Sequence, residues 1–271
     1  MQALLNVYLR TTKSPFLIID GVNSPSLEAA IKRFQTEHMK LARTADGRVD
    51  SAGKTFRLLK SVLSSVFVAE AITAPNYGVV TWASEGQEGG RYHSRKLHVP
   101  SPLSGLTLGR GYDCYRKSPS KIKSDLMLCG LGAREAELLG RASGLSGTAA
   151  AQFIIDNDLL DFQISPSQQK ALFKVSYDEQ ATEARRICEK PDVKELYGET
   201  DWGKLHHAIR EITIDLKFRG DYTRSSRKLI QTCIAGNDLV AFTRQLKDLS
   251  KWPHVPPNRF ERRAAFLDNA K

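Results

Sequence analysis

The stretch YGVVTWASEGQEGGRYHSRKLHVPSPLSGLTLGRGYDCY at residues 77–115 decides the fold. Its first part predicts a short helix or turn ending near Glu85, where Gly-Gln-Glu-Gly-Gly is too rich in glycine to continue regular structure. Further along, Leu106-Thr107-Leu108 alternates like a strand between glycines, which let a short sheet bend and a polymer approach closely. We therefore expect a small glycine-rich sheet that carries polar groups beside the end of a helix.

The chain after residue 116 predicts a series of helices. Apolar residues recur at helical spacing in segments 120–129, 132–142, 147–156, 165–189, 203–218, 223–235, 237–249 and 257–269. The helix at 165–189 has the clearest start, because Ser165-Pro166-Ser167-Gln168 supplies a capping residue and a proline at the first helical position. A small sheet followed by many helices is an α+β arrangement that is mostly helical.

Upstream of this stretch, residues 1–62 predict three short amphipathic helices. Their segments are 2–10, 25–41 and 51–62. Ser24 can cap the second helix, and Pro25 suits its first position. An Asp-Gly pair precedes each of the last two helices and favours a tight turn, because glycine accepts a positive φ.

This order of helices and turns resembles the three-helix peptidoglycan-binding domain. The residues that match its pattern are Asp20, Gly21, Ala30, Phe34, Gln35, Asp46, Gly47, Val49 and Thr55. The chain departs from the pattern where Ser24-Pro25 and Ser51-Ala52-Gly53 replace the usual Gly-Pro after each turn. The resemblance implies a wall-binding module whose loops contact the glycan near Asp20, Asn23, Arg48 and Asp50. The alternative is a plain helical bundle with the same turns.

Residues 63–75 form the predicted joint between two domains. The segment is apolar nearly throughout and ends at Ala74-Pro75-Asn76, which predicts a helix stop. It is expected either to be a linking helix or to continue the third helix, because a free linker would contain more Gly, Ser and charge. The expected domains are therefore 1–62, a joint at 63–75, and 76–271, with the two domains in contact.

The formal net charge of +10 predicts an anionic polymer as partner. Nucleic acid is disfavoured, because the basic residues are scattered and no zinc-finger, RNP-like or basic-plus-heptad segment is present. The four cysteines are far apart without metal-ligand spacing, so we expect reduced thiols, no metal and no cofactor. No signal peptide or membrane-spanning apolar run is found, and membrane insertion is not expected.

Glu85 and Asp113 are the natural pair for cleaving a glycosidic bond. Such cleavage needs a carboxylic acid to protonate the leaving oxygen and a second polar group to direct water. A glutamate at a helix end among Val79, Val80 and Trp82 is expected to have a raised pKa, as an acid catalyst requires. Glu88 is the rival for the acid, because it lies three residues further along.

Glu-Gly followed by G-L-T-L-G-R-G-Y-D resembles the active-site segment of phage-type lysozymes and of the muramidase domain of pesticin. The order Glu, Thr, Asp in T-x-G-x-G-x-D is that of the pesticin type. The resemblance implies that Glu85 is the general acid and that Thr107 and Asp113 position the attacking water, with inversion at the anomeric carbon. It also places Tyr112 along the substrate groove. RFERRAAFL at 259–267 resembles the closing helix of these enzymes.

Together the two resemblances imply a modular phage endolysin: a wall-binding module joined to a lysozyme-like muramidase. Its substrate would be the β-1,4 bond between N-acetylmuramic acid and N-acetylglucosamine in bacterial peptidoglycan. We expect a monomer that stays in the cytoplasm of the infected host until lysis and is then released to the wall. The alternatives are a lytic transglycosylase and a non-catalytic wall-binding virion or effector protein.

Overall fold

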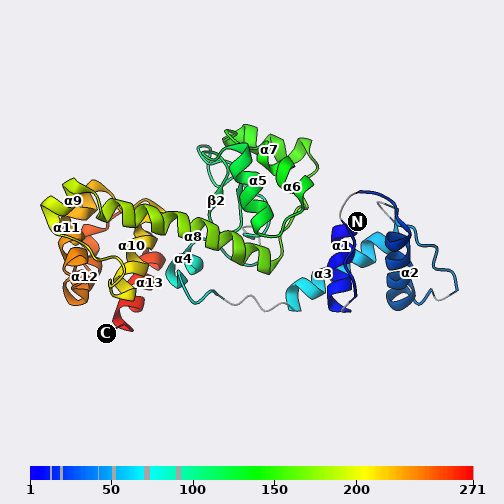
Figure 1. The fold of residues 1–271 in the computed structure, drawn as a ribbon, viewed down its shortest axis with the longest axis horizontal. Coiled ribbons are helices and arrows are strands. Elements are labelled where there is room, and N and C mark those ends of the chain that lie inside the picture. The colour runs from blue at the N-terminus through cyan, green and yellow to red at the C-terminus, as the bar shows by residue number, and fades with distance from the viewer. Residues whose placement is uncertain are drawn as a thin grey trace. The chain divides into compact units, whose positions relative to one another are not determined.

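The computed structural model confirms an α+β fold that is mostly helical. It describes residues 1–12, 14–18, 21–41, 43–50, 53–69, 74–89 and 93–270. Thirteen α-helices, one 3₁₀ helix and one two-stranded antiparallel sheet lie within these residues (Figure 1). No helix in this part of the chain is both long and apolar enough to cross a membrane. The chain divides into two compact units, Met1–Ile72 with Gly132–Glu135, and Thr73–Leu131 with Ala136–Lys271.

The first unit contains three helices, α1 (Gln2–Thr11), α2 (Pro25–Met39) and α3 (Lys54–Ala69). Its core consists of Leu5, Tyr8, Leu9, Leu27, Ala30, Ile31, Phe34 and Leu59. The predicted cap of α2 is confirmed, since the Ser24 hydroxyl accepts a hydrogen bond from Leu27 N at 3.2 Å. Helix α3 extends beyond its predicted end at residue 62, into the segment that was expected to join the domains.

Gln35 fixes the second Asp-Gly turn of this unit. Its buried amide oxygen accepts a hydrogen bond from Gly47 N at 3.0 Å, and its nitrogen donates to Asp46 Oδ1 at 2.8 Å and to Arg48 O at 3.0 Å. Gly47 has φ +71°, a value that favours glycine. The turn predicted at Asp46-Gly47 is therefore present, and a side chain of α2 holds it.

The second unit contains the remaining elements, apart from the first three residues of α6 (Ala133–Gly140), which fall in the other unit. They are α4 (Val79–Ser84), β1 (Thr107–Leu108), β2 (Tyr112–Asp113), α5 (Pro119–Leu128), α6 (Ala133–Gly140), α7 (Gly147–Asp156), α8 (Pro166–Cys188), α9 (Pro191–Tyr197), α10 (His207–Arg219), α11 (Arg224–Ala235), α12 (Leu239–Leu246), the 3₁₀ helix η1 (Leu249–Lys251) and α13 (Pro257–Asp268). All eight helical segments expected after residue 116 have a counterpart in this order. The short α9 was not predicted.

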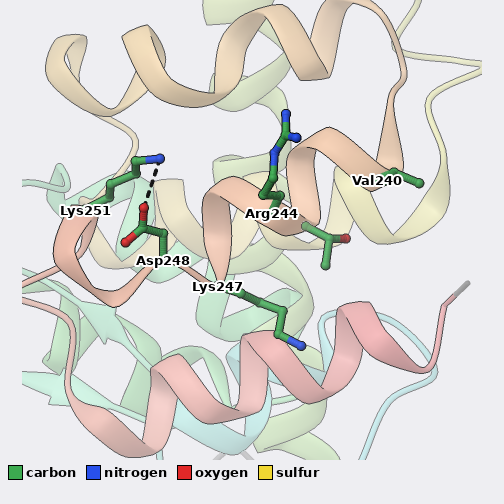
Figure 2. Close-up of a pocket in the computed structure, with 6 residues that line it drawn as sticks. Val240, Arg244, Lys247, Asp248 and Lys251 are labelled. Carbon is green, nitrogen blue, oxygen red and sulfur yellow. Dashed lines mark ion pairs between the residues drawn. The ribbon is translucent and has the colours of Figure 1, made fainter.

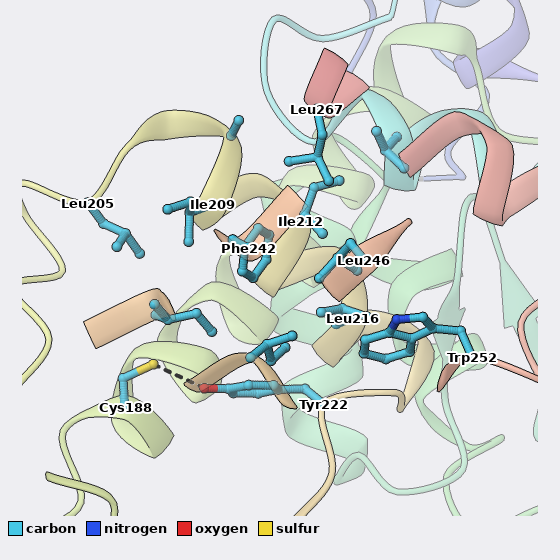
Figure 3. Close-up of a cluster of buried hydrophobic side chains, with 14 of the residues drawn as sticks. Cys188, Leu205, Ile209, Ile212, Leu216, Tyr222, Phe242, Leu246, Trp252 and Leu267 are labelled. Atoms are coloured by element: carbon cyan, nitrogen blue, oxygen red, sulfur yellow. Dashed lines mark hydrogen bonds between the residues drawn. The ribbon is translucent and has the colours of Figure 1, made fainter. Parts of the chain in front are cut away.

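Two apolar cores lie in the second unit, and α8 takes part in both. One core gathers β1, β2, α5, α6 and α7 and includes Leu172 of α8. The other gathers α10 to α13 and includes Ile187 and Cys188 near the end of α8 (Figure 3). Figure 1 shows α8 running from one group of helices to the other.

The predicted start of α8 is confirmed as a reciprocal cap. The Ser165 hydroxyl accepts a hydrogen bond from Gln168 N at 3.1 Å, and the Gln168 side chain accepts one from Ser165 N at 2.9 Å. Pro166 occupies the first helical position, where its missing N–H costs nothing. Local sequence therefore sets where this long helix begins.

Candidate active site

Glu85 ends the six-residue helix α4. Its main-chain N–H donates to Thr81 O at 2.9 Å, so the residue caps the last turn. The carboxyl Oε1 forms an ion pair with Nη1 of Arg259 on α13, and the Glu85 side chain is 21% exposed. One acidic side chain is thus held at a helix end with part of its surface open to solvent.

A buried ionic network lies behind Glu85. Arg259 Nη2 and Arg263 Nε contact the two oxygens of Asp215, each at 2.6 Å, and the Asp215 side chain is fully buried. Burial alone would raise the pKa of Asp215, but the two arginines outweigh it and hold this pKa below its ordinary value. Asp215 therefore stays ionised and pairs with both buried cations.

The expected apolar surroundings of the Glu85 carboxyl are not what the structure has. Val80 and Trp82 are buried, but the carboxyl meets the Arg259 guanidinium. The prediction of an apolar environment was wrong because the pairing residue lies 174 positions away in the chain. A carboxyl at the end of a helix can find a cation that local sequence does not reveal.

Hydrogen bonds to three side chains fix α4. At its start, Gly78 N donates to Glu211 Oε2 at 2.5 Å. In its middle, Thr81 Oγ1 donates to Asp215 Oδ1 at 2.8 Å. At its end, Arg110 Nη1 donates to Trp82 O at 2.5 Å and to Gly86 O at 2.6 Å. Glu85 is therefore carried by a helix that is anchored along its whole length.

Gly86, directly after Glu85, lies where there is no space for a side chain. A Cβ built there would lie 2.3 Å from Ser94 Oγ and 3.0 Å from Arg110 Cγ. Such distances are below ordinary van der Waals contact, so no larger residue fits without movement. Packing therefore favours glycine at position 86.

The hairpin brings Thr107 and Asp113 together. The two residues are directly opposite across β1 and β2, and opposite residues in an antiparallel pair point to the same face. Asp113 Oδ1 accepts from Tyr115 N at 2.7 Å and Oδ2 from Gly105 N at 3.2 Å. Thr107 is buried, and its hydroxyl donates to Gly105 O at 3.2 Å. Both side chains are tied to nearby main chain.

The hairpin turn lies next to Glu85. Gly111 has φ +85°, and a Cβ built on it would lie 3.5 Å from Glu85 Oε2 and 2.7 Å from the Phe218 ring. Only glycine fits this conformation and this space. The structure therefore brings the hairpin that carries Thr107 and Asp113 close to the glutamate.

A pocket of about 570 Å³ opens at Glu85. Its lining residues are Ala83, Ser84, Glu85, Gly86, Gln87, Ser94, His98, Val99, Pro100, Asn258 and Arg262. Thr107 and Asp113 are not among them. The pocket meets the hairpin through His98, whose main chain exchanges hydrogen bonds of 3.1 Å and 2.8 Å with Thr107.

Tyr112 does not line the groove, contrary to prediction. Its side chain is fully buried in the core of the hairpin and α5, and its hydroxyl donates to Asp125 Oδ2 at 2.8 Å. Burial and this bond raise the pKa of Tyr112. The physical reason is strand alternation, which turns Tyr112 to the face opposite Asp113.

Glu88, the rival acid, has a structural environment. Its carboxylate accepts from Arg95 Nε at 2.9 Å and from Gln169 Nε2 at 2.5 Å, with Arg110 Nη2 at 3.4 Å. Burial raises the pKa of Glu88, but Gln169 and Arg95 outweigh it and lower this pKa below its ordinary value. Glu88 is also not among the residues that line the pocket, whereas Glu85 is, and this placement favours Glu85.

The structure describes three of the four residues predicted to contact glycan in the first unit. Asp20 lies outside the described residues. Asn23, Arg48 and Asp50 are exposed, and they belong to the loops before α2 and α3. Arg48 N donates to Asp46 Oδ1 at 2.9 Å, which keeps its loop turned.

A second pocket, of about 620 Å³, lies along α12 and η1 (Figure 2). Val240, Thr243, Arg244, Lys247, Asp248 and Lys251 line it. Lys251 pairs with Asp248 at 3.0 Å, as the dashed line in Figure 2 marks. None of the predicted site residues lies in this pocket. All four cysteines are free thiols, and no group of three metal-ligating side chains lies among the described residues.

The fold and site define a mostly helical α+β domain with one partly exposed glutamate in a pocket beside a glycine-rich hairpin. Residues 78–264 match the model of a family described as Domain of unknown function (DUF8812). Since the match spans more than half of the chain, the protein belongs to this family. No curated protein matches the chain. The family description assigns no activity.

Sequence reasoning missed Asp215, Arg259 and Arg263 as parts of the site. A usable signal was present, because Asp215 interrupts the buried face formed by Ile212 and Leu216 on α10. A charge at such a position needs a partner of opposite sign. Arg259 and Arg263 are four residues apart on α13 and hence on one face of that helix.

Proposed function

We propose that this protein is a muramidase that hydrolyses the β-1,4 bond between N-acetylmuramic acid and N-acetylglucosamine in peptidoglycan. The observation that carries the proposal is the placement of Glu85 in a pocket with the Thr107–Asp113 hairpin beside it. The resemblance of this segment to phage-type and pesticin-type muramidases supports it. The net charge of +10 also suits an anionic wall polymer.

In the proposed mechanism Glu85 donates a proton to the leaving glycosidic oxygen. Water held on the hairpin side by Thr107 and Asp113 attacks the anomeric carbon, which inverts its configuration. Arg259 does not prevent this role, because it keeps Asp215 as a partner at 2.6 Å when Glu85 is neutral.

A lytic transglycosylase is the second candidate. The observation that favours it is that both Asp113 oxygens accept main-chain hydrogen bonds and that neither Asp113 nor Thr107 lines the pocket. In that reaction Glu85 would protonate the leaving oxygen and then take the proton of the muramoyl C6 hydroxyl, which attacks the anomeric carbon. No water enters, and the product carries a 1,6-anhydro end.

The test compares the wild type with Glu85→Gln on outer-membrane-permeabilised cells and on purified peptidoglycan. We expect turnover to fall about 10²- to 10⁴-fold, the usual contribution of a general acid. Glu183→Gln, on the exposed side of α8, is the matched control and should keep full activity. Full lysis by Glu85→Gln would remove the assignment, and an inert wild type would favour wall binding alone.

Mass spectrometry of the released glycans separates the two candidates. Hydrolysis leaves a reducing muramic acid end, whereas transglycosylation leaves an anhydro end that is lighter by one water. We expect reducing ends.

We further propose that the first unit binds the wall and that the whole chain acts as an endolysin, released to the wall when the host cell lyses. The pattern around Asp46-Gly47, held by Gln35, supports this part of the proposal.

A further inference from the structure

Helix α13 presents three arginines with different environments. Arg259 and Arg263 are buried, 5% and 1% exposed, and both pair with Asp215. Arg262 is half-buried and lines the Glu85 pocket. In the described part of the chain it has no carboxylate partner, and its polar contact is Nη1 to Ser84 Oγ at 3.5 Å. Two of these arginines are neutralised and the third is not.

Helical geometry explains this difference. Consecutive residues on an α-helix point about 100° apart, so Arg262 faces away from the direction of Arg263. Arg259 and Arg263, four residues apart, share the face that meets Asp215. Arg263 therefore lies in the buried ionic network, and its neighbour Arg262 lies in the pocket.

The pocket is lined by one permanent cation and one acidic side chain. Among its lining residues, Glu85 is the acidic side chain and Arg262 the arginine, while Ser84, Gln87 and Asn258 are neutral and polar. Neutral hydroxyl and amide groups suit the hydroxyl and acetamido groups of a sugar. A guanidinium suits a carboxylate, which it can bind through two parallel hydrogen bonds.

We propose that Arg262 binds a carboxylate of the muramoyl residue and so sets which sugar of the glycan occupies the Glu85 pocket. This inference rests on the proposed function, because it names the substrate group that the same pocket recognises. The carboxylate is either the lactyl group of N-acetylmuramic acid or a carboxylate of the attached peptide stem. A glycan without carboxylates lacks the group that this arginine selects.

The test measures kcat/KM of the wild type and Arg262→Ala on three substrates. They are intact peptidoglycan, glycan strands freed of peptide so that the lactyl carboxylate is exposed, and the same strands with their carboxylates amidated. Loss of a charge-assisted contact should lower kcat/KM about tenfold to a hundredfold on a substrate that carries the recognised carboxylate. On amidated strands the two enzymes should be equal, because the wild type loses the same factor.

The pattern of losses names the source of the carboxylate. A loss on the peptide-free strands alone assigns the lactyl group, because its carboxyl is held in an amide bond to the peptide in intact peptidoglycan. A loss on intact peptidoglycan alone assigns the peptide stem, and a loss on both shows that Arg262 accepts either carboxylate. Equal losses on all three substrates, or no loss on any, would overturn the inference. Arg244→Ala on α12 removes the same charge outside this pocket and should leave kcat/KM unchanged.

Two further sets of measurements separate loss of the carboxylate contact from loss of the fold and from failure of the proposed function. Arg262→Lys keeps the charge without the planar fork and should give an intermediate loss, and thermal unfolding shows whether each variant keeps its fold. Binding of peptide-free oligosaccharides and of soluble peptide-bearing muropeptides is compared between Glu85→Gln and Glu85→Gln with Arg262→Ala. An inert wild type together with about tenfold weaker binding of either ligand by the double variant would refute the muramidase and leave the carboxylate site standing. Equal binding of both ligands would refute the carboxylate site itself.

Discussion

The two sides of the candidate site are held in place by different kinds of interaction. On the α4 side, Glu85 depends on Arg259 and Asp215, charged residues that come from α13 and α10. On the hairpin side, Asp113 is held by main-chain N–H groups of Gly105 and Tyr115, all within ten residues. Long-range charge compensation therefore fixes the first side, and local hydrogen bonds fix the second. The two sides should respond differently to substitution.

The largest loss of stability is expected from Asp215→Asn. It removes the charge that compensates Arg259 and Arg263, and breaking a buried ion pair from one partner costs about 3–5 kcal/mol. Urea unfolding monitored by far-UV circular dichroism measures the change. Asp178→Asn, whose side chain is 56% exposed on α8, is the matched control and should cost under about 1 kcal/mol. Similar values for both variants would mean that the network does not hold the α4 side.

Gly86→Ala should have the next largest effect. The added methyl would meet Ser94 Oγ and Arg110 Cγ, and overpacking of this kind costs about 1–3 kcal/mol. Activity should fall as well, because Glu85 is the preceding residue. Gly203→Ala is the control, since a Cβ there meets only Asp201 Oδ1 at 3.5 Å. A Gly86→Ala protein with wild-type stability and turnover would contradict the packing argument.

Asp113→Asn should cost about 1 kcal/mol of unfolding free energy, because one of two main-chain hydrogen bonds is lost. Its effect on hydrolysis separates two roles. A loss of turnover of about a hundredfold or more is expected if Asp113 directs water. Unchanged turnover would make the hairpin a scaffold and strengthen the transglycosylase alternative.

Acid should weaken the α4 side gradually. Burial opposes ionisation of Asp215 and Glu88, but their cationic and amide partners hold both pKa values below ordinary ones. A carboxylate with a lowered folded pKa contributes stability that is present above its unfolded pKa, about 4 for these groups, and is lost as pH falls through the folded pKa. Urea midpoints measured from pH 7 down to pH 3 should therefore fall below about pH 4. Glu88→Gln should show a shallower fall than the wild type.

Local features of the molecule could be predicted from sequence. The starts of α2 and α8 follow from Ser24 and Ser165, which cap within three residues. The opposition of Thr107 and Asp113 follows from a tight turn of fixed length between them. In each case the residues that determine the geometry are neighbours in the chain.

Long-range features could not be predicted in this way. Glu85 and Arg259 are separated by 174 residues, and no local pattern connects them. The burial of Tyr112 was within reach, however, because alternation turns it away from the face of Asp113. Asp215 was also accessible to reasoning, since a charge on a buried helix face implies a partner.

The 23 residues of α8 contribute to both apolar cores of the second unit. A helix of this length spans about 35 Å, so one helix can pack against both cores. Unfolding of α8 would remove contacts from both cores, so we expect the two cores to unfold in one cooperative transition. A substitution at one end of α8, such as at Cys188, should then weaken the core built around the distant hairpin.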